Sequence, residues 1–300
     1  MSVNSVLFDH PGPSARRRNT VITVLGWLAV LALLGALGWG LRNEFTALKL
    51  RPFADGESWR FYIVPGLLNT LKAAGIAVLT SVVLGLALGC GRLSPVRLVS
   101  RVCGVLVEVF RAIPVLLMMI FWYYIAIYVL VLGREVAPLF GVVMGLTLYN
   151  ASVIAELVRS GVHSLPRGQR EAGLAIGMSE GQVLTSVQLP QAITAMLPSL
   201  VSQLVVILKD TALGTAILYT DLLKQLNDLA TYRGNVVAAM VFAAVVYIAL
   251  NFALTSLAQL VERRLRRSSR GGAPMDADRN LDAVNAGAMA SQVETPGSRL

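Results

Sequence analysis

The apolar residues of this 300-residue chain gather into six long runs that short polar segments separate. A helix needs about 20 mostly apolar residues to cross the roughly 30 Å of hydrocarbon in a membrane. Each run is long enough to do so. The pattern therefore predicts an all-α integral membrane protein with transmembrane helices at about 21–41, 63–91, 102–132, 137–157, 193–219 and 235–260.

Two of the runs need comment. The first follows three arginines, as a signal peptide does, but its apolar part is longer than the roughly 7–15 residues of a signal sequence, so we interpret it as a helix that stays in the membrane. The third is longer than a membrane requires. Its beginning is expected at the membrane interface, and Pro114 predicts a kink within it.

Composition and charge agree with a membrane protein. The chain is 55% hydrophobic and 14% charged, against about 25% charged in soluble proteins. Its net charge of +9 would suggest nucleic-acid binding in a soluble protein. Here the predicted loops on one side of the membrane hold 14 Lys and Arg residues, and those on the other side hold 7. The positive-inside rule therefore places both termini in the cytoplasm, and it also explains the net positive charge.

The same composition excludes several kinds of chemistry. The chain has two cysteines, which are too few for a disulfide framework, and its two histidines, His10 and His163, are too far apart in sequence for an HExxH metal site. No glycine is followed by lysine, so the phosphate-binding GxxxxGK[ST] loop is missing. We expect no catalytic, metal-binding or cofactor-binding residue in this chain, and hence no enzyme.

One predicted cytoplasmic loop, residues 160–191, has the pattern of a folded element. Its residues 171–176 favour a helix, Gly177 interrupts them, and Ser179 with Gln182 forms the pattern of a capping box. The loop predicts two short helices joined at Gly177, of which the second ends at Pro190. A helical hairpin on the membrane surface with a purely structural role would have the same pattern.

The sequence EAGLAIGMSEGQVLTSVQLP in this loop resembles the EAA signature of ABC importer permeases. Four features match that signature at the same spacing: Glu171-Ala172, Gly177, Leu189 and Pro190. Two positions differ, because Gly173 replaces an alanine and Val187 replaces an isoleucine.

Three further segments resemble the polar amino-acid (His/Glu/Gln/Arg/opine) group of these permeases: VEVFRAIPVLLMMIFWYY, ASVIAELVRSGVHSLPRGQREA and LKDTALGTAI. Together the similar segments cover about residues 62–260. The additional first helix and the arginine-rich composition look most like the actinobacterial glutamate-importer permeases.

The resemblance implies a type I ABC importer permease fold, with an N-terminal segment (1–20), a first helix (21–41), a five-helix transmembrane domain (62–260, coupling loop 160–191) and a basic, then disordered, cytoplasmic tail (261–300). It implies that the loop couples to a cytoplasmic ABC ATPase subunit, which holds ATP and Mg, through Glu171, Ala172, Gly173, Gly177, Leu189 and Pro190. It also implies a second permease subunit (a paralogue or a second copy), an extracytoplasmic substrate-binding protein, location in the bacterial cell membrane, and import of a polar amino acid, above all glutamate, with glutamine or aspartate as alternatives.

Charged residues within transmembrane helices are costly and often functional. We therefore expect the substrate pathway among Arg111, Tyr149, Asn150, Glu156, Lys209 and Asp210.

Structural roles are open for the same charges. Lys72 can extend its ammonium group to the interface, and Glu108 can neutralise Arg111 three residues later. Glu156 can pair with Arg159. Adjacent residues on a helix point about 100° apart, so Lys209 and Asp210 cannot satisfy each other comfortably, and we expect at least one of them to face a partner chain or an aqueous path.

Four glycines, Gly85, Gly89, Gly141 and Gly145, occur in pairs spaced by four residues and predict close helix packing. Other functions remain possible from the membrane pattern alone. They are an ion-gradient-driven secondary amino-acid transporter, a membrane-embedded enzyme and a subunit of an exporter, none of which accounts for the pattern of the 160–191 loop.

Overall fold

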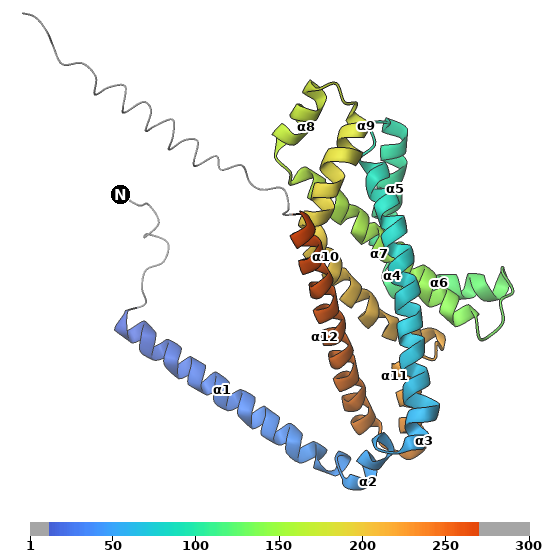
Figure 1. Cartoon of the computed structure of the whole chain (residues 1–300). Coiled ribbons are helices and arrows are strands. Elements are labelled where there is room, and N and C mark those ends of the chain that lie inside the picture. The colour runs from blue at the N-terminus through green and yellow to red at the C-terminus, as the bar shows by residue number, and fades with distance from the viewer. Residues whose placement is uncertain (1–11, 270–300) are drawn as a thin grey trace, which may run out of the picture. The chain divides into compact units, whose positions relative to one another are not determined.

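The computed structural model describes residues 12–269, so the tail predicted to be disordered after Arg270 lies outside the described residues. Every regular element in the described range is helical (Figure 1). The α-helices are α1 (Pro13–Leu41), α2 (Ala47–Leu50), α3 (Gly56–Ser58), α4 (Val64–Arg92), α5 (Arg97–Ala112), α6 (Val115–Tyr128), α7 (Ala137–His163), α8 (Arg167–Ala175), α9 (Glu180–Gln182), α10 (Leu189–Asp210), α11 (Leu222–Arg233) and α12 (Val236–Ser269).

The chain divides into two compact units, each with its own hydrophobic core. The first unit holds residues up to Ser81, Ile113–Tyr149 and Ile207–Leu250, and the second holds Val82–Ala112, Asn150–Val206 and the residues from Asn251 on. Two clusters of buried side chains form the core of the first unit, one around Met119 and Leu146 and the other around Leu222 and Leu226. The second unit is built around Ile154 and Val158 and around Val107 and Ala155.

Five helical segments of the described chain are long and apolar enough to cross a membrane, and a bent pair of helices would make a sixth. Five of the six predicted runs therefore correspond to such helices, and the third corresponds to the bent pair, so it is not one continuous helix. The chain bends by 101° between α5 and α6. Pro114, whose backbone is extended (φ −56°, ψ 133°), separates the two helices, because a proline disfavours helical geometry in the residue before it.

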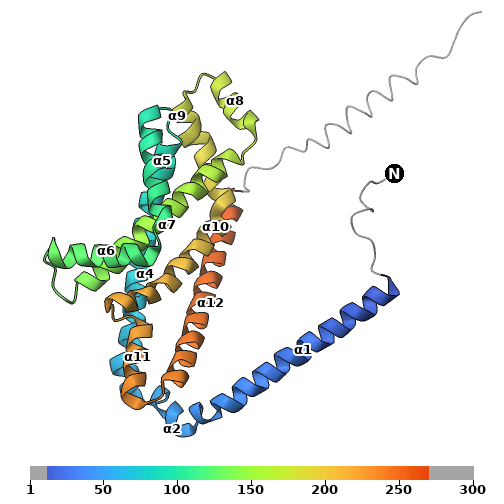
Figure 2. The same ribbon diagram turned by 180° about the vertical axis from the view of Figure 1, so that it is seen from behind.

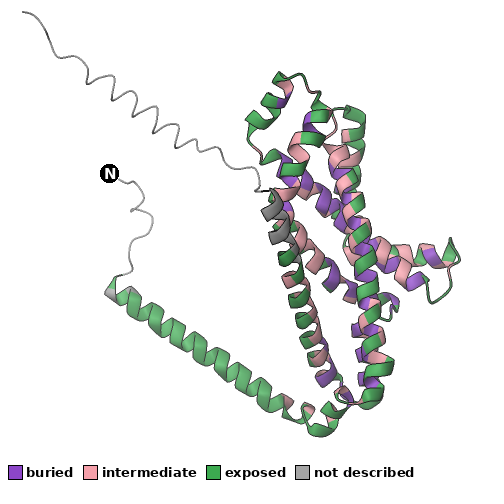
Figure 3. Ribbon diagram, viewed as in Figure 1, coloured by how far each residue is buried: buried purple, intermediate pink, exposed green. Residues whose placement is uncertain are grey.

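From Val21 to its end, helix α1 is apolar around nearly its whole circumference, and none of its apolar window is buried (Figure 3). A soluble helix of this composition would be covered by protein. Its exposure fits a helix whose surroundings are lipid, as the first apolar run predicts.

Two π-helical turns mark places where a proline enters a long helix. The turn Trp59–Ile63 (η4) precedes Val64-Pro65 at the start of α4, and the turn Val183–Gln188 (η5) precedes Leu189-Pro190 at the start of α10. A proline cannot donate a backbone hydrogen bond, and its ring displaces the carbonyl four residues earlier, so a wider turn accommodates it. The prediction that the second loop helix ends at Pro190 is therefore wrong, because the chain stays helical from Glu180 to Ile217.

The four glycines predicted to pack closely do so, each within its own unit. A Cβ atom at any of them would lie 2.6–2.9 Å from a side chain of another helix, which real Cβ atoms do not tolerate. The side chains are Ile154 beside Gly85, Val158 beside Gly89, Tyr123 beside Gly141 and Met119 beside Gly145.

A fully buried carboxylate, Asp221, caps α11 in the first unit. It accepts hydrogen bonds from the backbone N–H of Lys224 (2.9 Å), the Thr215 hydroxyl (3.2 Å) and the Tyr247 hydroxyl (3.1 Å). The cap thus joins α11 to α12 and to the 3-10 turn Thr211–Ile217 (η6). Burial raises the pKa of the Asp221 carboxyl, and its hydrogen bonds only partly oppose this effect.

We expect Gly85→Ala to lower the free energy of unfolding by about 1–3 kcal/mol, because the added methyl group meets Ile154 and the backbone oxygen of Ala151. Gly75→Ala in the same helix is the matched control, since a Cβ at Gly75 has no atom within 4 Å. Thermal denaturation in detergent measures both. Equal midpoints for the two variants would contradict the packing.

The Asp221 cap has a defined pH dependence. Because its pKa is raised in the folded chain, the folded chain binds this proton more readily than the unfolded chain does. The contribution of Asp221 to the free energy of unfolding therefore rises as the pH falls through the raised pKa toward the ordinary value of 3.8. We expect Asp221→Asn, which keeps an acceptor for the helix cap, to remove this trend. Thermal midpoints of both proteins are measured from pH 5 to pH 8. As the pH rises, the midpoint of the wild type should fall relative to that of Asp221→Asn. A constant difference between the two midpoints over this range would contradict the prediction.

Candidate functional site

The 160–191 segment forms a helical hairpin of α8 and α9, which we call the coupling hairpin (residues 167–188). Gly177 makes its turn with φ +87°, a conformation that side chains other than glycine rarely adopt. Its N–H donates to the Leu174 carbonyl (3.0 Å), and the N–H of Met178 donates to the Gly173 carbonyl (3.1 Å). These two bonds are the Schellman arrangement that ends a helix at a glycine.

The predicted capping box opens the second helix of the hairpin. The Gln182 N–H donates to the Ser179 hydroxyl (3.4 Å), and the Ser179 N–H donates to the Gln182 side-chain oxygen (2.8 Å). Helix termination at Gly177 and initiation at Ser179 leave only a short turn between the helices. The local sequence therefore fixes the shape of the hairpin.

Gly173, one of the two departures from the EAA pattern, lies where the two arms of the hairpin meet. The residue is buried, and a Cβ at this position would lie 2.8 Å from Val183. A glycine here lets α8 and η5 approach more closely than an alanine would. The close approach makes the hairpin compact.

The other predicted coupling residues lie on two parts of this segment. Glu171 and Ala172 are exposed on α8, while Leu189 and Pro190 begin α10. Figures 1 and 2 show α8 and α9 beyond the end of α7, on the same side as α5, in the second unit. The hairpin thus presents Glu171 and Ala172 on a surface that a partner could contact.

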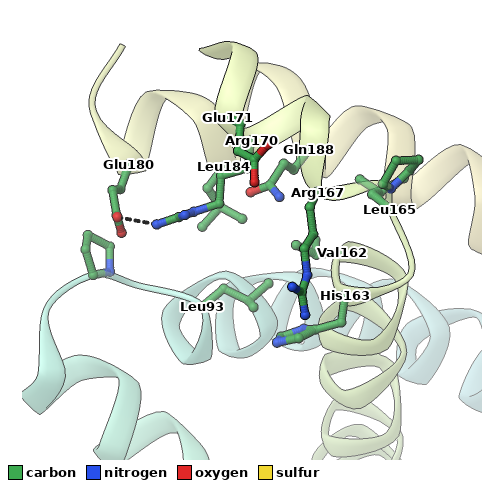
Figure 4. A pocket seen from close by; sticks show the side chains of 12 residues that line it. Leu93, Val162, His163, Leu165, Arg167, Arg170, Glu171, Glu180, Leu184 and Gln188 are labelled. Atoms are coloured by element: carbon green, nitrogen blue, oxygen red, sulfur yellow. Dashed lines mark hydrogen bonds and ion pairs between the residues drawn. The ribbon is translucent and has the colours of Figure 1, made fainter. Parts of the chain in front are cut away.

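A pocket of about 430 Å³ lies between the hairpin and the rest of the second unit (Figure 4). Its roof is α8, α9 and η5, and its floor is the end of α7 and the turn between α4 and α5. The lining residues are Leu93, Pro95, Val162, His163, Leu165, Pro166, Arg167, Arg170, Glu171, Glu180, Leu184 and Gln188.

A cluster of five charged side chains joins the ends of α4, α5 and α7 in the same unit. The Glu156 carboxylate accepts hydrogen bonds from Arg92 (2.6 Å) and Arg159 (2.5 Å), and Arg111 lies 3.6 Å away. Arg92 also donates to Glu108 (2.9 Å). Two carboxylates thus share three guanidinium groups, and Glu156, one quarter exposed, is the centre.

This arrangement corrects one expectation and confirms another. Glu108 and Arg111 do not neutralise each other, because Glu108 pairs with Arg92 and Arg111 lies beside Glu156. The pairing of Glu156 with Arg159 is confirmed. Arg92 stands 64 residues before Glu156, and no short-range helix rule could have predicted that contact.

The six predicted pathway residues divide between the two units. Arg111, Asn150 and Glu156 belong to the second unit, and Tyr149, Lys209 and Asp210 belong to the first.

Within the units, the polar residues of the pathway differ in their surroundings. Asn150 is fully buried and accepts a hydrogen bond from the Gln203 amide (2.5 Å), a partner that the sequence did not indicate. Lys209 is exposed and Asp210 is half-buried.

Comparison with known proteins identifies the family to which the chain belongs. The family model described as binding-protein-dependent transport system inner membrane component matches residues 81–267, more than half of the chain. The chain belongs to this family. The matched range of this permease includes the coupling hairpin, the Glu156 cluster and α7, α10 and most of α12.

Individual relatives are also transport permeases. The chain is 48% identical over 225 residues to the glutamate transport system permease protein GluD of Corynebacterium glutamicum, and the alignment covers 75% of this chain and 82% of that one. It is 31% identical over 209 residues to the glutamate/aspartate import permease protein GltK of Escherichia coli, covering 68% and 93%.

A solved structure shares the fold. The crystal structure of an amino acid ABC transporter with histidines aligns with a TM-score of 0.61 and 26% identity, over 67% of this chain and 93% of that one. The all-helical type I permease fold expected from the sequence is confirmed.

The Glu156 cluster gives a prediction for stability. Glu156→Gln removes the only carboxylate that pairs with Arg111 and Arg159 among the described residues and leaves Arg92 with Glu108 alone, so we expect a loss of about 2 kcal/mol or more. Glu108→Gln, at a side chain that is 62% exposed, should cost less than about 1 kcal/mol. Thermal midpoints in detergent compare the two, and an equal loss would contradict the central role of Glu156.

Proposed function

We propose that this chain is the permease subunit of an ATP-driven ABC importer and that its substrate is a polar amino acid, glutamate before glutamine or aspartate. The observation that carries the proposal is the coupling hairpin, which combines the EAA pattern with a rigid, exposed shape at one end of the second unit. The names of the relatives GluD and GltK support glutamate as the substrate.

The energy source is proposed to lie on another subunit. The sequence has no phosphate-binding GxxxxGK[ST] loop, so ATP and Mg would bind a separate cytoplasmic ATPase that contacts the hairpin. Glu171 and Ala172 supply the exposed contact surface, Gly173 and Gly177 give the hairpin its shape, and Leu189 and Pro190 carry its movement into α10. Movement of the hairpin would then switch the transmembrane helices between inward-facing and outward-facing states.

The remaining partners follow from the same proposal. A second permease subunit would complete the pathway, and an extracytoplasmic binding protein would deliver the amino acid. The cation distribution supports a cytoplasmic location for both termini and for the hairpin, in the cell membrane of a bacterium. Arg111, Tyr149, Asn150, Glu156, Lys209 and Asp210 remain candidates for the pathway, with Glu156 also holding the arginine cluster together.

We expect Gly177→Val to lower ATP-dependent glutamate uptake by about tenfold or more, because valine cannot adopt φ +87° without strain and the hairpin must change shape. Gly181→Val is the matched control, since a Cβ at Gly181 in α9 has no atom within 4 Å. Uptake is measured in cells that carry the binding protein and the ATPase, with membrane insertion checked by blotting.

Two results would contradict the coupling role. The first is normal uptake by Gly177→Val at normal expression. The second is purification of the full chain from its native membrane, in mild detergent, without any ATPase subunit.

A further inference from the structure

A pocket in the first unit lies between the connection that follows α1 and the last turn of α11. Its volume is about 540 Å³. The connection supplies α2 and the 3-10 turn Arg51–Phe53 (η3) to one side of the pocket, and α11 supplies its last residue to the other. The lining residues are Leu48, Arg51, Pro52, Asp55 and Arg233.

The membrane-spanning helices place this pocket at the boundary of the membrane. The first candidate span ends at Glu44 and the second begins at Gly56, while α12 begins at Val236, directly after the turn that ends α11. Trp59 and Tyr232 are exposed there, as aromatic side chains commonly are at the interface between hydrocarbon and water. The groups that surround the pocket in a membrane are therefore lipid headgroups.

Specific contacts hold the connection against the core of the first unit. The Phe53 ring stacks on Phe242 of α12 with ring centroids 4.7 Å apart, and the Trp59 indole N–H donates to the Phe53 carbonyl (2.8 Å). The Asn235 amide donates to the Lys49 carbonyl (2.8 Å). Figures 1 and 2 both show α2 and α3 beside the end of α11 and the start of α12. The pocket is therefore formed before any ligand binds.

The lining of the pocket carries charges of both signs. In the described part of the chain, Arg51, Asp55 and Arg233 form no ion pair within 4.0 Å and no side-chain hydrogen bond. The two arginines are exposed and Asp55 is half-buried, so all three can reach a ligand. Leu48, which is 78% exposed, adds apolar surface beside them. Two cations, one anion and an apolar side chain complement a lipid headgroup that carries both charges.

We propose that this pocket binds the headgroup of a phospholipid with a primary ammonium group, as in phosphatidylethanolamine. The phosphodiester lies between Arg51 and Arg233, because guanidinium groups recognise phosphate oxygens through paired hydrogen bonds. The ammonium group binds the Asp55 carboxylate, and Leu48 contacts the glycerol backbone where the acyl chains begin. The volume of about 540 Å³ falls within the roughly 300–1,000 Å³ of small-molecule sites.

An acidic segment of a protein partner is the other occupant that two arginines could receive. The lipid is favoured for two reasons. An acidic segment would leave the Asp55 carboxylate facing a like charge, whereas the ammonium group neutralises it. The pocket also lies at the level of the headgroups. The bound lipid would join the end of α11 to the connection that carries α1, a helix whose apolar window has no buried residue.

The test uses the full chain, purified in detergent and freed of lipid, and measures lipid binding by native mass spectrometry. Phosphatidylethanolamine and phosphatidylcholine share the phosphodiester, but the trimethylammonium group of phosphatidylcholine has no N–H to donate to a carboxylate. We expect phosphatidylethanolamine to bind at least about fivefold more tightly. Equal binding of the two lipids, or tighter binding of phosphatidylglycerol, which has no ammonium group, would overturn the proposal.

Variants of the lining test each contact. Arg51→Gln and Arg233→Gln should each weaken the binding of phosphatidylethanolamine by about tenfold. Asp55→Asn should lower it to the level of phosphatidylcholine. Arg60→Gln is the matched control, because it removes an exposed cation of the same unit that does not line the pocket, and it should bind as wild type does. Thermal midpoints without lipid, which should equal that of wild type, verify that each variant is folded.

Two further outcomes separate the lipid from other occupants. Glycerophosphoethanolamine, the headgroup without acyl chains, should displace the lipid only at a concentration at least about tenfold higher, and displacement at equal concentration would overturn a lipid site. Unchanged lipid binding by Arg51→Gln and Arg233→Gln, together with lost binding of a purified extracytoplasmic binding protein, would also overturn it and indicate a protein contact. None of these measurements uses ATP or uptake, so their results do not depend on the proposed function.

Discussion

The carboxylate of Glu156 is the contact on which the second unit depends. It binds Arg92 from α4 and Arg159 from its own helix α7, with Arg111 of α5 at 3.6 Å. These charges are only partly exposed, and partly buried charges are stable when they are paired, so the cluster favours one arrangement of the three helix ends. The coupling hairpin begins four residues after α7 ends, and its position therefore rests on this cluster.

The hairpin itself is stabilised by local interactions that do not need the rest of the protein. A Schellman end at Gly177, a capping box at Ser179 and the contact of Gly173 with Val183 fix its shape. Under the coupling role proposed above, such an element would move as one body when a partner displaces it. The pocket beneath leaves space between the hairpin and the floor of the unit, so displacement does not require repacking of a filled core.

The features of this structure that depend on residues close together in the sequence could be predicted from the sequence. Apolar runs gave the helices, the Gly177 and Ser179 pattern gave the hairpin, and the glycine spacing gave the close helix contacts. Contacts between distant residues were not predictable, as the pairing of Arg92 with Glu156 shows. The helix end expected at Pro190 failed because a π-helical turn, which no sequence rule specifies, accommodates the proline.

The most direct test of the account asks which energy source drives uptake. Purified permease, ATPase and binding protein are reconstituted into liposomes, and labelled glutamate uptake is followed with ATP on the hairpin side and ionophores that remove all ion gradients. We expect uptake to continue under ionophores and to stop when ATP is replaced by a non-hydrolysable analogue. Uptake that stops with the ionophores and does not need ATP hydrolysis would contradict the account and indicate a secondary transporter.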